Sequence, residues 1–148
     1  MAKIFTTRGA QPIMTAEFVF GPGDTMRDIN GVEKTFGAVF ADGGTFDAIN
    51  LPNGAIVLGG SLIVETAGAG PTAYTVAVGT AANATQYLAA TDLKALARTP
   101  LVGLGLASYD GKNVRITIAS TVANATAGKF RLRVDYAIES RITEVNPN

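Results

Sequence analysis

The C-terminal part of the chain alternates apolar and polar residues over a long stretch, and no other feature restricts the fold as strongly. Between Lys129 and Arg141, every second position is apolar: Phe130, Leu132, Val134, Tyr136 and Ile138. The other positions include Arg131, Arg133, Asp135 and Glu139. A period of two is typical of a β-strand with one face on a core and the other in water. The sequence therefore predicts an antiparallel, all-β domain.

Shorter stretches repeat this pattern between glycine-bearing turns. They are Met14–Phe20, Tyr74–Val78 and Val114–Ile118, while Ala55–Glu65 is apolar on both faces, with Ile56, Leu58, Leu62 and Val64 on one and Val57 and Ile63 on the other. A strand of the latter kind lies at the centre of a covered sheet or at a subunit interface, and the sequence leaves both open. Seven or eight short strands of this kind predict a β-sandwich of the jelly-roll or a related type.

Two local signals complete the predicted secondary structure. Thr91 and Asp92 suit the start of one short helix, in which Leu93 and Leu96 share a face, and Thr99 before Pro100 ends it. After a strand over 101–107, whose Gly103 and Gly105 indicate a closely packed face, Asp110-Gly111 predicts a hairpin turn into Val114.

The first third of the chain differs from the rest. Residues 1–50 are rich in glycine turns, and we interpret them as an extended N-terminal arm beside a sandwich body over 51–148. The alternative is a few extra edge strands folded onto the body. Five aromatic residues are the candidate anchors for contacts with a partner or a sister subunit: Phe18, Phe20, Phe36, Phe40 and Phe46.

The composition argues against catalysis. The chain contains no His, Cys or Trp, so the commonest general base and the thiolate ligands are absent, and we expect no enzyme activity, metal or cofactor. The carboxylate pairs Asp24 with Asp28 and Asp42 with Asp47 lie beside glycines, where such groups usually bond to their own turn. A hydrolase is therefore the least favoured interpretation.

Charge is low and balanced. Charged residues make up only 16% of the 148 residues, against about 25% in an average soluble domain, while 47% are hydrophobic. Twelve basic and twelve acidic side chains cancel, so we expect no nucleic-acid or membrane partner, and we expect some apolar surface to meet another protein. No secretory signal precedes the first strands, which predicts synthesis in the cytoplasm.

Three arginines fall on the polar positions of two predicted strands. If these strands are neighbours, Arg115, Arg131 and Arg133 form a basic strip that could contact an acidic partner. Ion pairing across the strands, with acids such as Asp135, is the simpler alternative.

The body of the chain resembles the head decoration proteins, also called cement proteins, of tailed bacteriophages. The resemblance lies in strand and turn spacing within Leu51–Gly60, Val76–Gly79, Tyr87–Asp92 and Gly128–Tyr136. It implies a jelly-roll virion protein that forms a dimer or trimer on the outer surface of the head and bridges neighbouring copies of the major capsid protein. A sugar-binding sandwich module for adsorption to a host is the alternative function.

Overall fold

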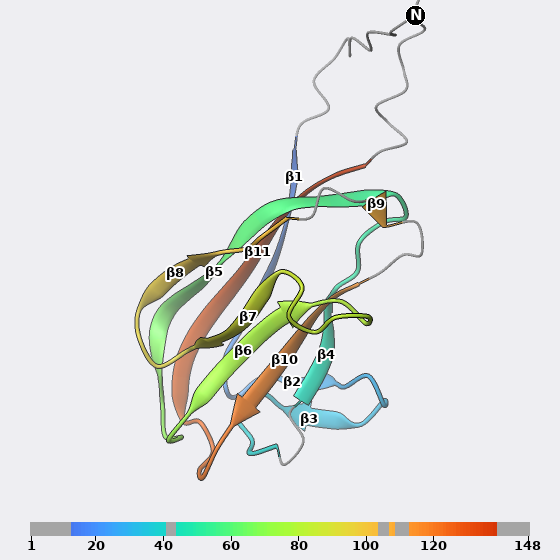
Figure 1. Ribbon diagram of the computed structural model, residues 1–148. Coiled ribbons are helices and arrows are strands. Elements are labelled where there is room, and N and C mark those ends of the chain that lie inside the picture. The colour runs from blue at the N-terminus through green and yellow to red at the C-terminus, as the bar shows by residue number, and fades with distance from the viewer. Residues whose placement is uncertain (1–12, 41–43, 104–106, 109–112, 139–148) are drawn as a thin grey trace, which may run out of the picture.

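The computed structural model describes residues 13–40, 44–103, 107–108 and 113–138, which contain eleven strands and no helix. These strands form a sandwich of two antiparallel sheets, with a small hairpin at one end (Figure 1). The all-β, antiparallel prediction is confirmed. No helix long and apolar enough to cross a membrane occurs within the described ranges.

The two sheets take their strands from the whole length of the chain. The five-stranded sheet has the order β1 (Met14–Phe20), β11 (Ala127–Ile138), β5 (Ala55–Ala69) and β8 (Ala97–Pro100), and β9 (Ala107–Ser108) also pairs with β5. The four-stranded sheet has the order β4 (Gly44–Ile49), β10 (Val114–Ser120), β6 (Tyr74–Gly79) and β7 (Leu88–Asp92). The hairpin consists of β2 (Thr25–Arg27) and β3 (Glu33–Thr35).

The eight strands of four or more residues pair in a nested way. The first pairs with the last, β1 with β11, and the second with the second last, β4 with β10. Further in, β5 pairs with β8 and β6 with β7. Pairing of β11 with β5 and of β10 with β6 then joins these four strand pairs into two sheets. The chain therefore runs like one long antiparallel hairpin wrapped around a core.

The core lies between the sheets and follows the predicted alternation. On β11, Phe130, Leu132 and Val134 are fully buried, whereas Arg131 and Arg133 on the other parity remain partly exposed. The Tyr74 ring of β6 packs edge-on against Phe130, with centroids 5.6 Å apart, and so connects the two sheets. Burial of apolar surface on both inner faces is the main stabilising term for this fold.

The two-sided strand β5 contains a bulge that its sequence pattern conceals. Tyr136 faces Val57 while Asp135 faces Gly59, so one extra residue interrupts the register. Val57 and Leu62 are therefore both buried despite their opposite parity, and Leu58 is 45% exposed. The prediction that Leu58 shares a face with Leu62 is wrong, because the bulge reverses the alternation. β5 lies inside its sheet, between β11 on one side and β8 and β9 on the other, and a subunit interface on its outer face stays a prediction.

The predicted short helix is absent, since Leu88–Asp92 and Ala97–Pro100 are strands. Between them, the Lys94 N–H donates to the Asp92 carboxylate at 2.9 Å, so this side chain forms a turn where a helix N-cap was predicted. Leu93 is fully buried and exchanges backbone hydrogen bonds with Tyr74 and Gly68, while Leu96 is 71% exposed. The two leucines therefore share no face, and tertiary hydrogen bonds hold Leu93 in a bend between two strands.

The hairpin predicted at Asp110-Gly111 lies outside the described residues, but the strands on either side of it belong to different sheets. β9 pairs with β5, whereas β10 pairs with β4 and β6. The connection therefore crosses between sheets, and the expected pairing of β10 with its preceding strand is wrong. Close packing at Gly103 is confirmed, because a Cβ there would overlap the backbone of Leu58.

The first third of the chain supplies strands to both sheets. β1 is an edge strand of the five-stranded sheet and β4 an edge strand of the four-stranded sheet. Both strands pair with strands of the predicted body, β1 with β11 and β4 with β10, while the division at residue 50 stays a prediction. Residues 1–12 of the predicted arm lie outside the described residues.

Candidate functional surfaces

The predicted aromatic anchors form a cluster inside the sandwich. Phe20, Phe36 and Phe46 are buried, with the Phe36 ring 5.6 Å from Phe20 and 4.7 Å from Phe46. Phe18 and Phe40 are half-buried and pack against the same cluster. The prediction that all five are surface anchors is therefore wrong for the three buried rings, because apolar alternation in an edge strand and a buried turn drives them into the core. For Phe18 and Phe40 it stays a prediction.

The three candidate arginines do not form one strip. Arg115 lies on β10 in the four-stranded sheet, where its Nε is 2.7 Å from the Asp47 carboxylate of β4. Arg131 and Arg133 lie on β11 in the other sheet. Because the two outer faces point away from each other, the predicted basic strip is wrong. The alternative of ion pairs across strands is confirmed for Arg115 and Arg131, whereas Arg133 pairs with Asp135 on its own strand.

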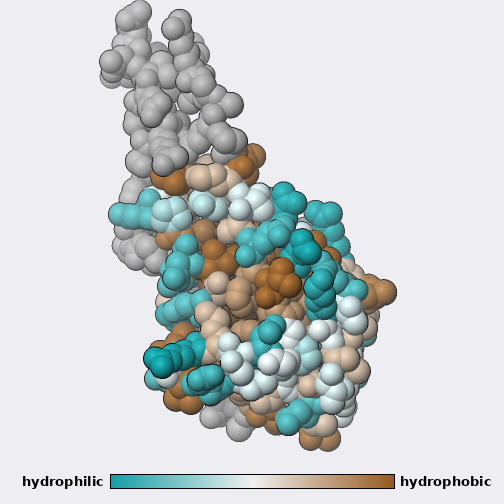
Figure 2. All heavy atoms as spheres, turned by 180° about the vertical axis from the view of Figure 1, so that it is seen from behind, coloured by the Kyte–Doolittle hydropathy of each residue, from teal (hydrophilic) through white to brown (hydrophobic). Residues whose placement is uncertain are grey.

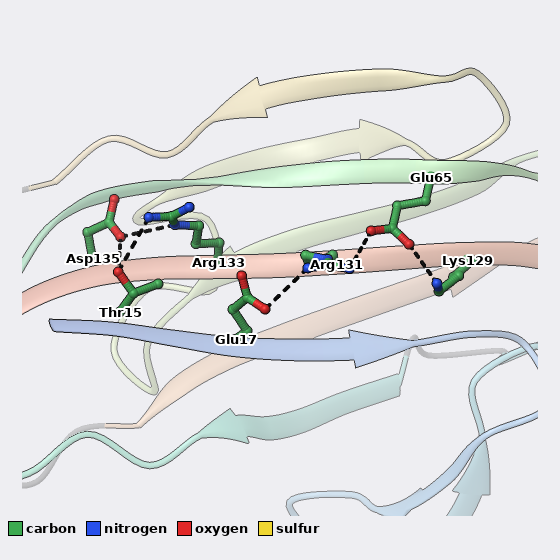
Figure 3. Close-up of polar contacts among 7 residues, drawn as sticks. All are labelled: Thr15, Glu17, Glu65, Lys129, Arg131, Arg133 and Asp135. Carbon is green, nitrogen blue, oxygen red and sulfur yellow. Dashed lines mark hydrogen bonds and ion pairs between the residues drawn. The ribbon is translucent and has the colours of Figure 1, made fainter.

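Charged side chains gather on the outer face of the five-stranded sheet and pair with one another (Figure 3). We define this charged face by the residues Thr15, Glu17, Glu65, Lys129, Arg131, Arg133 and Asp135. Arg131 lies 3.3 Å from Glu17 on β1 and 2.7 Å from Glu65 on β5, and Lys129 lies 2.9 Å from the other oxygen of Glu65. Arg133 is 3.3 Å from Asp135, which also accepts a 2.8 Å hydrogen bond from Thr15.

The charged face is nearly compensated. Hydrogen bonding from Lys129, aided by the positive charges of Lys129 and Arg131, holds the pKa of Glu65 below its usual range. Because these pairs are partly exposed, solvent screens them and each contributes little to stability. Figure 2, seen from behind Figure 1, shows hydrophilic side chains around a smaller group of hydrophobic ones on that side of the molecule.

Asp24 and Asp28, which the sequence offered as a catalytic pair, accept hydrogen bonds from the backbone of their own turns. The Asp28 side chain is almost fully buried, accepts N–H groups of Asn30 and Val32 at 2.9 Å, and lies 2.8 Å from the Lys34 ammonium. These bonds, led by that of Lys34, lower the pKa of Asp28. Asp24 accepts the Gly21 N–H. The turn interpretation of this pair is confirmed.

Chemistry beyond these contacts is sparse. Asp42 lies outside the described residues, so its pairing with Asp47 stays untested, and no three His, Cys, Asp or Glu side chains gather as a metal site in the described ranges. Burial raises the pKa of Tyr74 to about 12, and its hydroxyl donates to the Phe36 carbonyl at 3.2 Å. Burial also raises the pKa of Tyr87. These tyrosines are structural groups of the core.

Comparison with known proteins gives one informative likeness. A solved structure described as "Cyanophage Pam1 capsid asymmetric unit" contains a chain that aligns with 93% of this chain and 94% of its own length, with 26% sequence identity and a TM-score of 0.60. No known protein-family model matches the chain, and no curated protein matches it. The likeness spans nearly the whole length of both chains. It supports a phage structural role, a virion location and association with capsid proteins.

Proposed function

We propose that this protein decorates the outside of a phage head and cements neighbouring copies of the major capsid protein. The observation that carries the proposal is the end-to-end likeness to a chain of a phage capsid asymmetric unit at 26% identity. Because the two aligned shares are nearly equal, the two chains have similar lengths, and the likeness is not that of a fragment to a larger protein.

We further propose that the sandwich is a jelly roll. The nested pairing of β1 with β11, β4 with β10, β5 with β8 and β6 with β7 supports this, since wrapping a long antiparallel hairpin around a core produces two interleaved four-stranded sheets of this order. Jelly rolls are common in viral capsid proteins. A compact two-sheet body with its loops at the ends suits repeated attachment to a lattice.

The surface chemistry supports a structural role over sugar binding or catalysis. Aromatic side chains that stack on sugars are missing from the large hydrophobic residues exposed within the described part of the chain. Zero formal net charge avoids repulsion when many copies crowd one shell. Several weak contacts per oligomer, either a dimer or a trimer, would add through multivalency and stabilise the shell.

Quantitative mass spectrometry of purified particles tests this proposal. We expect copies of this chain to stand in a simple ratio to copies of the major capsid protein, and we expect surface labelling of intact particles to reach this chain. Heads assembled without it should rupture at a lower temperature. A handful of copies per particle, or none, would contradict a lattice-wide decoration protein and point to a tail-associated adhesin or a non-virion protein.

A further inference from the structure

Three loops meet at the end of the sandwich that is opposite the N-terminus in Figure 1. We call this surface the neutral tip, and it consists of Phe36–Phe40, Ala69–Ala73 and Thr121–Thr126. Backbone and side-chain hydrogen bonds join the three loops directly. Ala125 N–H donates to the Gly37 carbonyl at 2.7 Å, and Thr126 N–H donates to the Ala69 carbonyl at 2.9 Å. The neutral tip is therefore one continuous surface whose three loops are joined by hydrogen bonds.

None of the three loops carries a charged residue, although one residue in six of the whole chain is charged. Two charged groups reach the loops from neighbouring segments: the Lys94 ammonium donates to the Thr72 carbonyl, and the Lys34 ammonium lies 5.4 Å from the centre of the Phe40 ring. Val39 is 44% exposed and Val122 is 83% exposed, the highest value among the large hydrophobic side chains of the described part. Depletion of charge around exposed apolar side chains distinguishes the centre of a protein interface from ordinary surface.

Val122 has a backbone conformation that its side chain disfavours. Its φ is +72°, and it has the only positive φ among the described residues other than glycine. Ala123 N–H donates to the Thr121 carbonyl at 2.9 Å, so Val122 is the centre of a γ-turn with positive φ, which is the rare and strained form. For a β-branched residue this conformation is a true outlier, whereas glycine or asparagine would adopt it with less strain.

The surrounding contacts hold this strained turn in place. Thr121 forms backbone hydrogen bonds with Thr72 and Ala73, at 3.2 and 3.0 Å, and the Ser120 hydroxyl donates to the Ala123 carbonyl at 3.1 Å. The Asn124 side chain accepts the Val39 N–H at 3.1 Å, which places both exposed valines beside one residue. Strained residues that a structure fixes so firmly are concentrated at binding sites. Folding alone gives no reason to hold an apolar side chain outward on such a turn.

We propose that the neutral tip is a docking surface, and that Val122 inserts into an uncharged, apolar depression on the phage shell protein. This rests on the decoration role proposed above. The tip is small, with five residues each in Phe36–Phe40 and Ala69–Ala73 and six in Thr121–Thr126, against roughly 20 to 30 residues a side in a standard stable interface. A surface of that size favours repeated docking on a lattice, where copies act together, over a stable pairing of two tips.

Binding to phage heads assembled without this chain tests the proposal. The test variant is Val122→Asp, which puts a charge into the neutral tip. The matched control is Val102→Asp, because Val102 is 65% exposed and precedes Gly103, which packs on Leu58 toward the other end of β5. Loss of a buried valine contact at each docking site predicts at least about a tenfold weaker affinity for Val122→Asp and no change beyond about twofold for the control. Thermal unfolding of each variant checks the fold.

A second variant separates docking from folding. Val122→Gly relieves the strain and removes the apolar side chain, so it should melt no lower than the wild type and still bind heads at least about tenfold more weakly. If the wild type binds and the Val122 variants bind equally well, the docking role of the tip is refuted while the decoration role stands. If the wild type does not bind, both the docking role of the tip and the decoration role are refuted. If Val122→Asp changes the oligomeric state in sedimentation, the tip contacts a second copy, and the proposed partner is wrong.

Discussion

Replacing Phe36 by alanine distinguishes a core role from a surface role for the aromatic residues of the first third of the chain. Phe36 is 2% exposed, although it lies in the turn after β3 and not in a strand. Its ring contacts three others, with centroids 4.7 Å from Phe46, 5.6 Å from Phe20 and 6.1 Å from Phe18. The turn therefore places one ring into the core at the end of the sandwich.

The expected loss of stability follows from this packing. Truncation of a buried phenylalanine to alanine usually costs about 3–5 kcal/mol, because transfer free energy is lost and a cavity remains. The Phe36 ring packs edge-on against three other rings, which favours a loss in the upper part of this range. At about 3 °C per kcal/mol for a domain of this size, the melting temperature should fall by roughly 9 to 15 °C.

Thermal and urea unfolding, followed by circular dichroism, measure this effect. The control is Phe40→Ala, because the Phe40 ring is half-buried, 6.2 Å from Phe46, and lies under the Lys34 ammonium at 5.4 Å. We expect the control to lose less than half as much stability as Phe36→Ala. An unchanged melting temperature for Phe36→Ala, together with weaker head binding, would refute the core assignment and restore the surface-anchor prediction.

Three further predictions test separate contacts. Gly60→Ala should destabilise by more than about 2 kcal/mol in urea unfolding, because Gly60 has a φ of +142° and a Cβ would overlap the Arg133 carbonyl; wild-type stability would contradict the close packing of β5 on β11 at Gly60. The pKa of Asp28 lies below its unfolded value near 3.8, so its contribution is present above that pH and is lost as pH falls through the folded pKa. Asp28→Asn should therefore flatten the acid dependence of the urea midpoint, and an unchanged slope would contradict this. The pKa of Tyr74 is raised to about 12, so its contribution is full below pH 10 and is lost as pH rises toward 12; ultraviolet titration of Tyr74→Phe should lack the latest phenolate, and retention of that step would exclude Tyr74 as its source.

The candidate surfaces were less predictable from the sequence than the strands. The pairing of Arg131 with Glu17 and Glu65 depends on three strands that are far apart in the chain, and only the sheet order brings them together. Val122 has no turn signature in its sequence, since valine is disfavoured at positive φ. The loop 69–73, which forms hydrogen bonds with the turn around Val122, becomes its neighbour only in the folded sandwich.

Local pattern by itself determined the strands that bury one face in a regular register. In β11 and β10 every second side chain is apolar, and burial follows that alternation because the side chains of a strand point to opposite faces. Tertiary structure decided the rest: the bulge in β5 reverses its parity, backbone hydrogen bonds keep Leu93 out of a helix, and β9 and β10 enter different sheets. Each of these outcomes depends on partners distant in sequence, whose hydrogen bonds and packing outweigh local preferences of about 1 kcal/mol per residue.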